Sequence, residues 1–309
     1  MVIGPPTLTI VVVNYNTREL LLGCLSSIER SCSQSAARIE TILVDNGSTD
    51  GSVEAATEAF PRVTVHPCRV NRGFGAGANL VLRGLIGPYA LVLNADMEAL
   101  GDAPAAMVRF AERTPRAGIV GGSLVYPDGR FQHGAFRFPT PLMDLFDLFP
   151  PHPLIADSWL NGRYSRAFLR RPRRVDHPLG GAMLIRREVV EQTGGFDEAY
   201  FMYCEELDLA RRASHLGWEA WHTPEGRFVH HAGAATRQTP DAMAIALRRS
   251  RKRYAANHRS ALSRGLSTGI DVAGQVRDTL ALIRDLRSGS ISARQFEERR
   301  SWYRRRSRG

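Results

Sequence analysis

Two adjacent glutamates in the second half of the chain, Glu205 and Glu206, are the residues best suited to acid–base chemistry. They follow the glycine- and aromatic-rich run 194–203 and open a segment whose apolar residues recur at helical spacing. Burial and mutual repulsion both raise a carboxyl pKa toward neutrality, so such a pair can act as a general base. Acidic residues also favour the first turn of any helix, and this structural interpretation is preferred when the pair is taken alone.

A predicted strand and a predicted helix alternate four times in the first hundred residues, which indicates an α/β fold with a mostly parallel sheet flanked by helices. Ligands of such sheets collect beyond the carboxyl ends of the strands. Asn14, Asp45 and Asp96 fall at or just after strand ends, so we expect a ligand there, although Asp45 also suits a turn. The strands are expected at residues 8–13, 39–44, 63–65 and 89–93.

Asp96 and the pair His230-His231 are candidates for a divalent metal site. One carboxylate or one imidazole is too little to hold such an ion, and a lone histidine is more often structural. Together with the oxygens of a nucleotide diphosphate, they could bind Mn²⁺ or Mg²⁺ and offset charge on the departing diphosphate.

The glycine-rich segment 73–78 fits the dinucleotide pattern G-x-G-x-x-A. That pattern belongs directly after the first strand, whereas here the strand is the third and seven residues separate Val65 from Gly73. An NAD site is therefore not expected. The glycines instead predict a close approach of the backbone to a ligand or to a neighbouring loop.

Composition and charge set the class of protein. The chain has 309 residues, 43% of them hydrophobic and 23% charged, as in globular proteins. Its four cysteines show no CxxC pair and predict reduced thiols, which together with the absence of a signal-like start predicts a cytoplasmic protein. No apolar run reaches the roughly 18 residues of a membrane-spanning helix.

The net charge of +10 is concentrated in the last fifth of the chain. Residues 248–309 hold 17 Lys and Arg against 5 Asp and Glu, and their helical pattern at 272–286 is amphipathic. A basic amphipathic tail suits an anionic membrane surface, but also a solvated tail or a dimerisation helix. Nucleic-acid binding is a rival that leaves Asp96 and Glu206 unexplained. Residues 137–178, rich in proline and arginine, predict a long loop or lid, and its Arg170, Arg171, Arg173 and Arg174 suit either a diphosphate or solvent.

Six ordered motifs over residues 7–240 resemble the inverting glycosyltransferases of family 2, particularly their bacterial rhamnosyltransferase-like branch. The motifs are VVVNYNT, VDNGSTDGS, NRGFGAGAN, LNAD, GGAMLIRREVVEQTGGFDEAYFMYCEELDLARR and VHH. The resemblance implies a GT-A fold over residues 1–240, with nucleotide-sugar binding in 1–100, acceptor binding and the base in 101–240, and a basic helical tail in 241–309.

The resemblance also implies a role for each matching residue. Glu206, beside Glu205, would be the base, although the family commonly has aspartate at this position. Asp96 and His230 would hold the metal, with His231 a near rival for the histidine. The remaining donor-site residues would contact the nucleoside or shape the donor pocket: Asn14, Asn16, Asp45, Asn71, Gly73, Phe74, Asn79 and Asn94.

The activity implied is transfer of L-rhamnose from dTDP-L-rhamnose to a hydroxyl of a cell-envelope glycan or a polyprenyl-diphosphate-linked acceptor. A UDP-hexose or UDP-galactofuranose donor is the alternative, and a catalytically silent nucleotide-sugar or nucleic-acid binding protein is the alternative from another class. The expected location is cytoplasmic and peripheral on the inner face of the cell membrane, with a homodimer as one further possibility.

Overall fold

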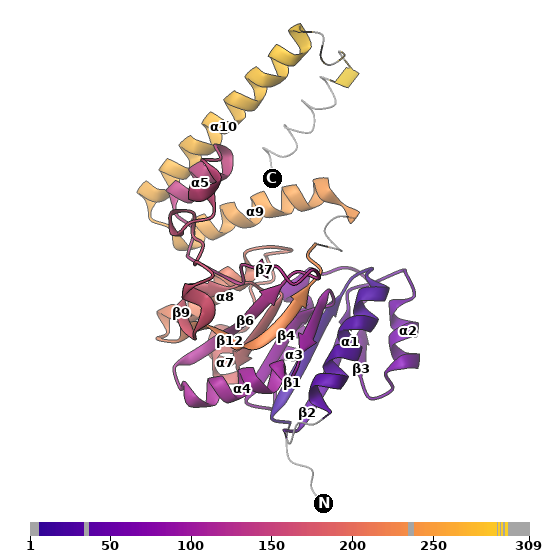
Figure 1. The fold of residues 1–309 in the computed structure, drawn as a ribbon. Coiled ribbons are helices and arrows are strands. Elements are labelled where there is room, and N and C mark those ends of the chain that lie inside the picture. Colours follow the sequence, from indigo (N-terminus) through magenta and orange to yellow (C-terminus); the bar gives the residue numbers. More distant parts are fainter. Residues whose placement is uncertain are drawn as a thin grey trace, which may run out of the picture. The chain divides into compact units, whose positions relative to one another are not determined.

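The computed structural model describes residues 6–33, 37–233, 238–288, 290, 292 and 294–295. The chain divides into two compact units, one formed by Met1–Arg137 with Tyr164–Thr239 and the other by Phe138–Arg163 with Pro240–Gly309. The first unit contains the large sheet, shown in Figure 1, and every residue assigned to the site from the sequence.

The main sheet has the strand order β3-β2-β1-β4-β11-β6-β12-β5. Six of these strands run in one direction, and β11 and β5 run against them. The α/β fold with a mostly parallel sheet is thereby confirmed. The strands are β1 (Leu8–Asn14), β2 (Ile39–Asp45), β3 (Thr64–Pro67), β4 (Tyr89–Asn94), β5 (Met97–Leu100), β6 (Ala117–Val125), β11 (Ala182–Arg186) and β12 (Glu219–His230), with β7 (Phe131–Gln132) and β9 (Arg173–Val175) at its margins and β8 (Ala135–Phe136) paired with β10 (His177–Pro178).

Helices cover both faces of this sheet, because its central strands are apolar on both sides. Ile10 and Val12 of β1 pack into a core shared with α1 and α4, while the alternate residue Val11 is buried toward the other face, where α3 packs. In Figure 1, α1 and α4 lie in front of the sheet and α7 and α8 behind it. The helices of this unit are α1 (Arg18–Cys32), α2 (Ser52–Ala59), α3 (Phe74–Leu82), α4 (Ala103–Arg113), α7 (Arg187–Thr193) and α8 (Glu205–His215), with the 3-10 turn η2 (Phe168–Arg170).

Strand direction brings the polar strand ends together. β1, β2, β4 and β12 are mutually parallel in direction, so Asn14, Asp45, Asn94 and His230 close their strands at the same edge of the sheet. β11 runs the other way and therefore begins there, with Gly181 accepting a backbone hydrogen bond from Asn94 at 3.0 Å. The site must lie at this edge.

β5 and β12 were not predicted from the sequence, and both matter for the site. β5 follows Asp96 directly and pairs antiparallel with the end of β12, setting Met97 opposite His230. β12 was missed because its polar residues and Pro224 obscure the alternation expected of a strand. The segment 137–178, expected as a long loop or lid, forms several short helices and strands.

The second unit is helical. It contains α5 (Pro141–Leu148), α6 (Pro153–Ala156), η1 (Trp159–Asn161), α9 (Pro240–His258) and α10 (Ala261–Arg287). Residues 138–163 join the C-terminal helices because Asp144 accepts from Arg259 and Asp147 pairs with Arg251 at 2.6 Å. This grouping differs from the continuous 101–240 segment expected from the resemblance. Residues 296–309 of the basic tail, including Arg304-Arg305-Arg306, lie outside the described residues.

A buried ion pair fixes the segment that leads into α8. Asp208, whose side chain is 2% exposed, pairs with Arg212 at 2.6 Å and accepts from the Tyr200 hydroxyl at 3.4 Å. Arg212 also donates to the carbonyls of Thr193 and Gly195, both at 2.8 Å. One guanidinium thus joins α8 to the loop that precedes it.

Replacing this arginine should destabilise the protein strongly. Arg212→Ala leaves a buried carboxylate without its counter-ion, so we expect the free energy of unfolding in urea to fall by about 3 kcal/mol. Arg109→Ala is the matched control, since its pair with Asp102 is solvent-exposed and should contribute about 0–1 kcal/mol. Equal losses in the two variants would contradict the assigned role of Arg212.

Candidate active site

The glutamate pair opens α8 from a strained turn. Tyr203 and Cys204, which precede Glu205, both have left-handed backbone angles, with φ of 68° and 65°. Such angles are unfavourable for residues other than glycine and persist where the surrounding structure holds them. The turn delivers the two carboxyl groups into different environments: Glu205 is buried, whereas Glu206 is only partly buried.

Burial sets the proton affinity of both carboxyl groups. Desolvation, followed by repulsion from Glu206, raises the pKa of Glu205 well above its ordinary range, and its Oε2 has no hydrogen-bond partner among the described residues. Desolvation also raises the pKa of Glu206, to about 7. Glu205 is therefore held neutral, and Glu206 is the accessible carboxyl that exchanges its proton near neutral pH.

The glycine-rich segment makes room for the loop that carries this pair. A Cβ on Gly73 would lie 2.2 Å from the Phe201 carbonyl oxygen, and one on Gly75 would lie 2.9 Å from the Phe196 Cβ. The Phe74 amide donates to that same Phe201 carbonyl at 3.2 Å. Of the two roles weighed from the sequence, the structure shows the close approach to a neighbouring loop.

Asn71, Phe74 and Asn79 complete this junction. The Asn71 side chain accepts from the Gly73 amide at 2.9 Å, and the Phe74 ring meets Phe196 edge-on at 6.0 Å. The buried Asn79 amide accepts from the Phe196 N–H at 3.0 Å and donates to its carbonyl at 2.9 Å. Asn79 therefore fixes the loop that carries Phe196.

Asn14, Asp45 and Asn16 form one hydrogen-bonded network through Ser48. The Asn14 amide donates to Asp45 Oδ1 at 2.8 Å, and Asp45 also accepts from the Ser48 hydroxyl at 2.6 Å and from its amide. The Asn16 backbone N–H donates to Ser48 Oγ, while the Asn16 side-chain oxygen Oδ1 accepts from the Thr49 N–H. Asn14 and Asp45 are almost fully buried, so they hold the loop that their strands lead into.

Asp96 and His230 meet at the end of the sheet. His230 Nε2 lies 3.5 Å from Asp96 Oδ1, a buried oxygen that has no hydrogen-bond partner in the described part of the chain. His230 Nδ1 donates to the side-chain oxygen Oε1 of Gln132 at 3.1 Å, which leaves the lone pair on Nε2. Burial is the main cause that lowers the pKa of His230, so the ring is held neutral.

This pair fits a divalent metal ion. A buried carboxylate oxygen and a neutral imidazole nitrogen face one another, and the Gln132 contact is the outer hydrogen bond typical of metal-binding histidines. His231 points elsewhere, with its Nε2 2.7 Å from Glu98 Oε1. Within the described residues no group of three or more His, Cys, Asp and Glu side chains is arranged for a metal.

Gly180 links the glutamates to this edge. A Cβ on Gly180 would lie 3.3 Å from the Glu206 Cβ, and its neighbour Gly181 accepts from the Asn94 amide. The sequence analysis assigned no role to Gly180, Gln132 or Ser48. Gly180 opens the motif GGAMLI, and Ser48 is the turn residue three positions after Asp45, whereas Gln132 left no signal.

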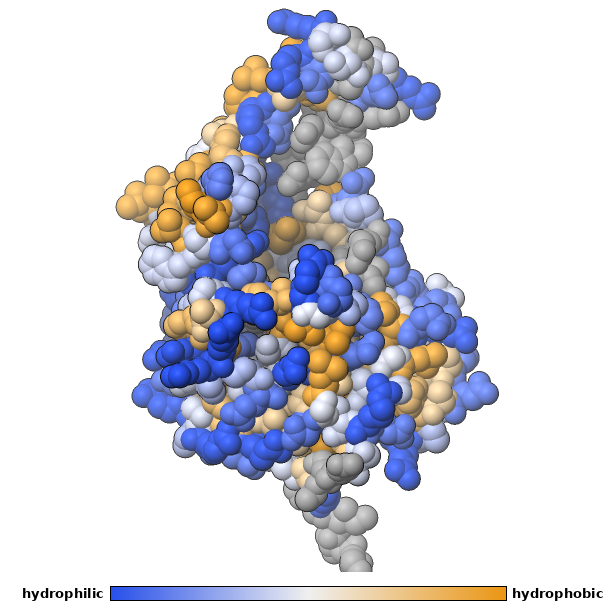
Figure 2. All heavy atoms as spheres, viewed as in Figure 1, coloured by the Kyte–Doolittle hydropathy of each residue, from blue (hydrophilic) through white to orange (hydrophobic). Residues whose placement is uncertain are grey.

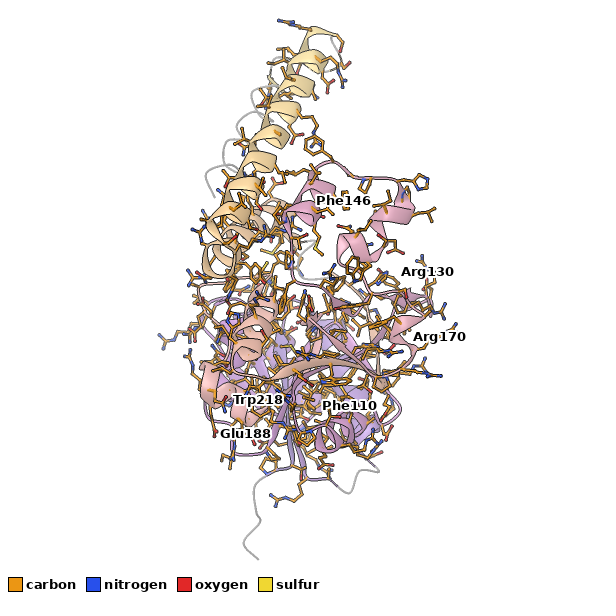
Figure 3. All side chains as sticks on the ribbon, turned by 90° about the vertical axis from the view of Figure 1, so that its left-hand side faces the viewer. Phe110, Arg130, Phe146, Arg170, Glu188 and Trp218 are labelled. Carbon is orange, nitrogen blue, oxygen red and sulfur yellow. The ribbon has the colours of Figure 1, made fainter. Side chains whose placement is uncertain are left out.

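The arginines of the 170–174 segment do not gather into a cluster. Arg173 stacks over the Phe168 ring at 5.0 Å, and Arg174 pairs with Glu219 at 3.3 Å. Figure 3 shows Arg170 with Arg130 at an outer edge of this unit. These contacts favour the solvated alternative over a diphosphate site.

Comparison with known proteins agrees with this architecture. The description Glycosyl transferase family 2 matches residues 9–194, so the chain belongs to this family and is a glycosyltransferase. It is 28% identical, over 75% of its length and 78% of the relative, to an N-acetylglucosaminyl-diphospho-decaprenol L-rhamnosyltransferase of Mycobacterium tuberculosis. A segment of 58 residues, 19% of this chain and 22% of the relative, is 40% identical to a rhamnosyltransferase of Escherichia coli.

Solved structures confirm the GT-A fold expected from the sequence. A mannosyltransferase of Pyrobaculum calidifontis, solved with GDP-Man and Mn²⁺, superposes with a TM-score of 0.56 over 98% of this chain and 86% of its own, at 17% identity. At this identity the likeness concerns the fold alone. Among the described residues, no helix is both long and apolar enough to span a bilayer.

The raised pKa of Glu206 predicts a pH-dependent cost to stability. A carboxyl that holds its proton more tightly when folded weakens the folded state as pH rises from its ordinary pKa of 4.5 to about 7. Glu206→Gln removes this effect. Relative to wild type, its free energy of unfolding should therefore gain on the order of 1–2 kcal/mol between about pH 5 and about pH 8.

Urea unfolding at the two pH values measures this gain. Glu58→Gln, on the exposed side of α2, is the control and should show the same difference from wild type at both. A Glu206→Gln difference that does not grow with pH would contradict the assigned environment of Glu206.

Proposed function

We propose that the chain transfers L-rhamnose from dTDP-L-rhamnose, with inversion, to a hydroxyl of a polyprenyl-diphosphate-linked glycan of the cell envelope. The observation that carries the proposal is the likeness to the mycobacterial enzyme over three quarters of this chain, because that relative is a rhamnosyltransferase whose name specifies a lipid-diphosphate sugar acceptor. The site is compatible with this reaction, since it pairs an accessible carboxyl with a carboxylate–imidazole pair at the strand ends.

Glu206 is the proposed general base. It takes the proton from the acceptor hydroxyl, whose oxygen attacks the anomeric carbon of the donor as the nucleotide diphosphate leaves from the opposite side. Its pKa of about 7 matches this task, since a base works best when its pKa lies close to the working pH. A well-placed base contributes about 10²- to 10⁴-fold to the rate. The neutral Glu205 behind it is proposed to keep Glu206 in a site of low polarity.

Asp96 and His230 are the proposed metal ligands. A bound Mn²⁺ or Mg²⁺ would stabilise the negative charge of the departing diphosphate. Asp96 supplies a buried oxygen that accepts no hydrogen bond from the described residues, and Gln132 orients the imidazole so that Nε2 faces this oxygen. Asn94, at the end of β4, is proposed to contact the donor beside them.

The loop that follows β2 is the proposed nucleoside site. Asp45 accepts hydrogen bonds from the Asn14 side chain and from the Ser48 hydroxyl of this loop. The Asn16 backbone N–H donates to Ser48 Oγ and so joins this loop to the loop after β1. This rigid edge supports the donor role assigned to Asn14, Asn16 and Asp45, while Asn71, Gly73 and Phe74 hold the base loop against it.

A UDP-hexose or UDP-galactofuranose donor remains the second candidate, because no side chain of the site reads the sugar by itself. The second unit is proposed to make the protein peripheral at the inner face of the membrane, through an attraction of its basic residues to anionic lipid worth about 1 kcal/mol each.

Thermal stabilisation by nucleotides tests the donor. We expect dTDP with Mn²⁺ to raise the melting temperature more than UDP, GDP or NAD, with about 2.7 kcal/mol of stabilisation at 100 times the dissociation constant. Asp96→Asn should lose the metal-dependent part of the shift. Asp128→Asn, in an exposed turn, should keep it.

The other outcomes are equally informative. A preference for UDP would assign a hexose or galactofuranose donor in place of rhamnose. Absence of a shift with every nucleotide diphosphate would contradict the proposed donor site, and an unchanged Mn²⁺ effect in Asp96→Asn would contradict the proposed metal ligand.

A further inference from the structure

An apolar groove lies between α5 and α10 in the second unit. Its volume is about 600 Å³, within the range of about 300–1,000 Å³ typical of small-molecule sites. Every lining residue is apolar or glycine, so the groove offers no side-chain hydrogen bond. The lining consists of Leu145 and Phe149 from α5 and its end, and Ala261, Leu262, Gly265, Leu266, Gly269, Ile270 and Ala273 from α10.

The walls of the groove are fixed by polar contacts outside it. Asp144 of α5 accepts from Arg259 and from the Ser267 hydroxyl, the latter at 2.7 Å. At the other end Arg277 donates to the Leu148 carbonyl and stacks over the Phe149 ring at 4.8 Å. The groove is therefore a formed feature of this unit and does not require a ligand to assemble it.

Three glycines of α10 differ in the space around them, which shows where α10 packs closely against α5 and where it does not. A Cβ on Gly274 would lie 3.0 Å from Leu148, so this glycine lets the helices pack closely. A Cβ on Gly265 or on Gly269 would meet no atom within 4 Å. Glycine lowers helix propensity, and at these two positions it keeps space open that the packing of the helices does not use.

The groove leaves large apolar side chains in solvent. Leu262 is 76% exposed, Leu266 54%, and Leu145 and Phe149 37% each. In Figure 2 the hydrophobic colour gathers over α5 and the adjoining turns of α10. Exposed apolar patches of this kind mark sites of interaction.

The charge of the surrounding helices restricts the occupant. The groove lining is neutral, but the exposed Arg264 precedes the lining residue Gly265 directly, and α9 carries the exposed Arg249. Arg248 and Arg251 of α9 are already paired with Asp271 and Asp147, at 3.0 and 2.6 Å. A hydrocarbon chain can be buried in a groove that offers no hydrogen-bonding groups, and an anionic head group can pair with exposed arginines beside it. A lipid that joins a long apolar chain to a phosphate meets both conditions.

We propose that the α5–α10 groove binds the isoprenoid chain of the lipid-linked acceptor. The identity of the acceptor rests on the proposed function. The position of the site rests on the apolar lining and on the exposed basic residues near it. The chain lies against Leu145, Phe149 and Leu266, and the open positions at Gly265 and Gly269 accommodate its branches. Acceptor recognition is thereby assigned in part to the second unit, separately from the sugar-transfer site.

Photo-crosslinking of the full-length protein tests this binding without donor or turnover. The probe is a benzophenone-tagged polyprenyl phosphate in neutral phosphatidylcholine vesicles, compared with an equally tagged phosphatidic acid at the same mole fraction. We expect labelling by the polyprenyl probe to be localised to residues 141–149 and 261–273, and to exceed labelling by phosphatidic acid by about tenfold.

A groove-filling variant supplies the decisive comparison. Gly265→Leu with Gly269→Leu has space for the new side chains and a better helix former at both positions, so it should fold. This variant should reduce labelling by about tenfold, because excluding about two methylene groups of the isoprenoid chain from the groove weakens binding by about that factor. Thr268→Leu with Gln275→Leu adds bulk to exposed positions of α10 outside the groove and should label like wild type.

Several results would overturn the proposal. One is equal labelling by the two probes, which would indicate that the groove binds ordinary acyl chains of the bilayer. Another is labelling of the groove-filling variant as strong as that of wild type. A dimer in sedimentation that only the filled variant loses, without polyprenyl labelling in wild type, would assign the groove to a second copy. Failure of the proposed transfer reaction is distinguishable, because it would leave the labelling pattern intact.

Discussion

The site depends on a contact between two backbones that only glycine permits. Gly73 and Gly75 allow the loop before α8 to lie against the start of α3, where any side chain at Gly73 would collide with the Phe201 carbonyl. The Phe74 amide and the Asn79 side chain then fix that loop by hydrogen bonds. This contact places the glutamate pair, carried by the second half of the sheet unit, against a glycine segment carried by the first half.

The polar groups of the site differ in their exposure to water, and their protonation differs accordingly. Glu205 is buried and held neutral, whereas Glu206 is partly open and titrates near neutral pH. His230 is likewise kept neutral by burial and oriented by Gln132, with its free nitrogen toward Asp96. Control of their access to water thus suits these ordinary residues to the proposed roles of base and metal ligands.

The sequence predicted the elements with strong periodicity and the residues with clear chemistry. β1, β2 and β4 were predicted close to their observed bounds, because buried strands carry local patterns. β5 and β12 did not, since their pairing is decided by tertiary contacts, yet they bring Asp96 to His230. The roles of Gln132 and Gly180 could not be predicted either, because the side chains that they contact, His230 and Glu206, are known only from the structure. The grouping of 138–163 with the C-terminal helices depends in the same way on ion pairs between distant residues.

The pH dependence of the single-turnover rate, measured in wild type and in Glu206→Gln with the donor that stabilises the protein, tests the central claim most directly. If Glu206 is the base, the wild-type rate should rise with pH through an apparent pKa of about 7 and then level off. In Glu206→Gln the rate should fall by about 10²- to 10⁴-fold and lose this dependence. A wild-type rate that does not change across this range, or a variant that keeps both the rate and its pH dependence, would contradict the account.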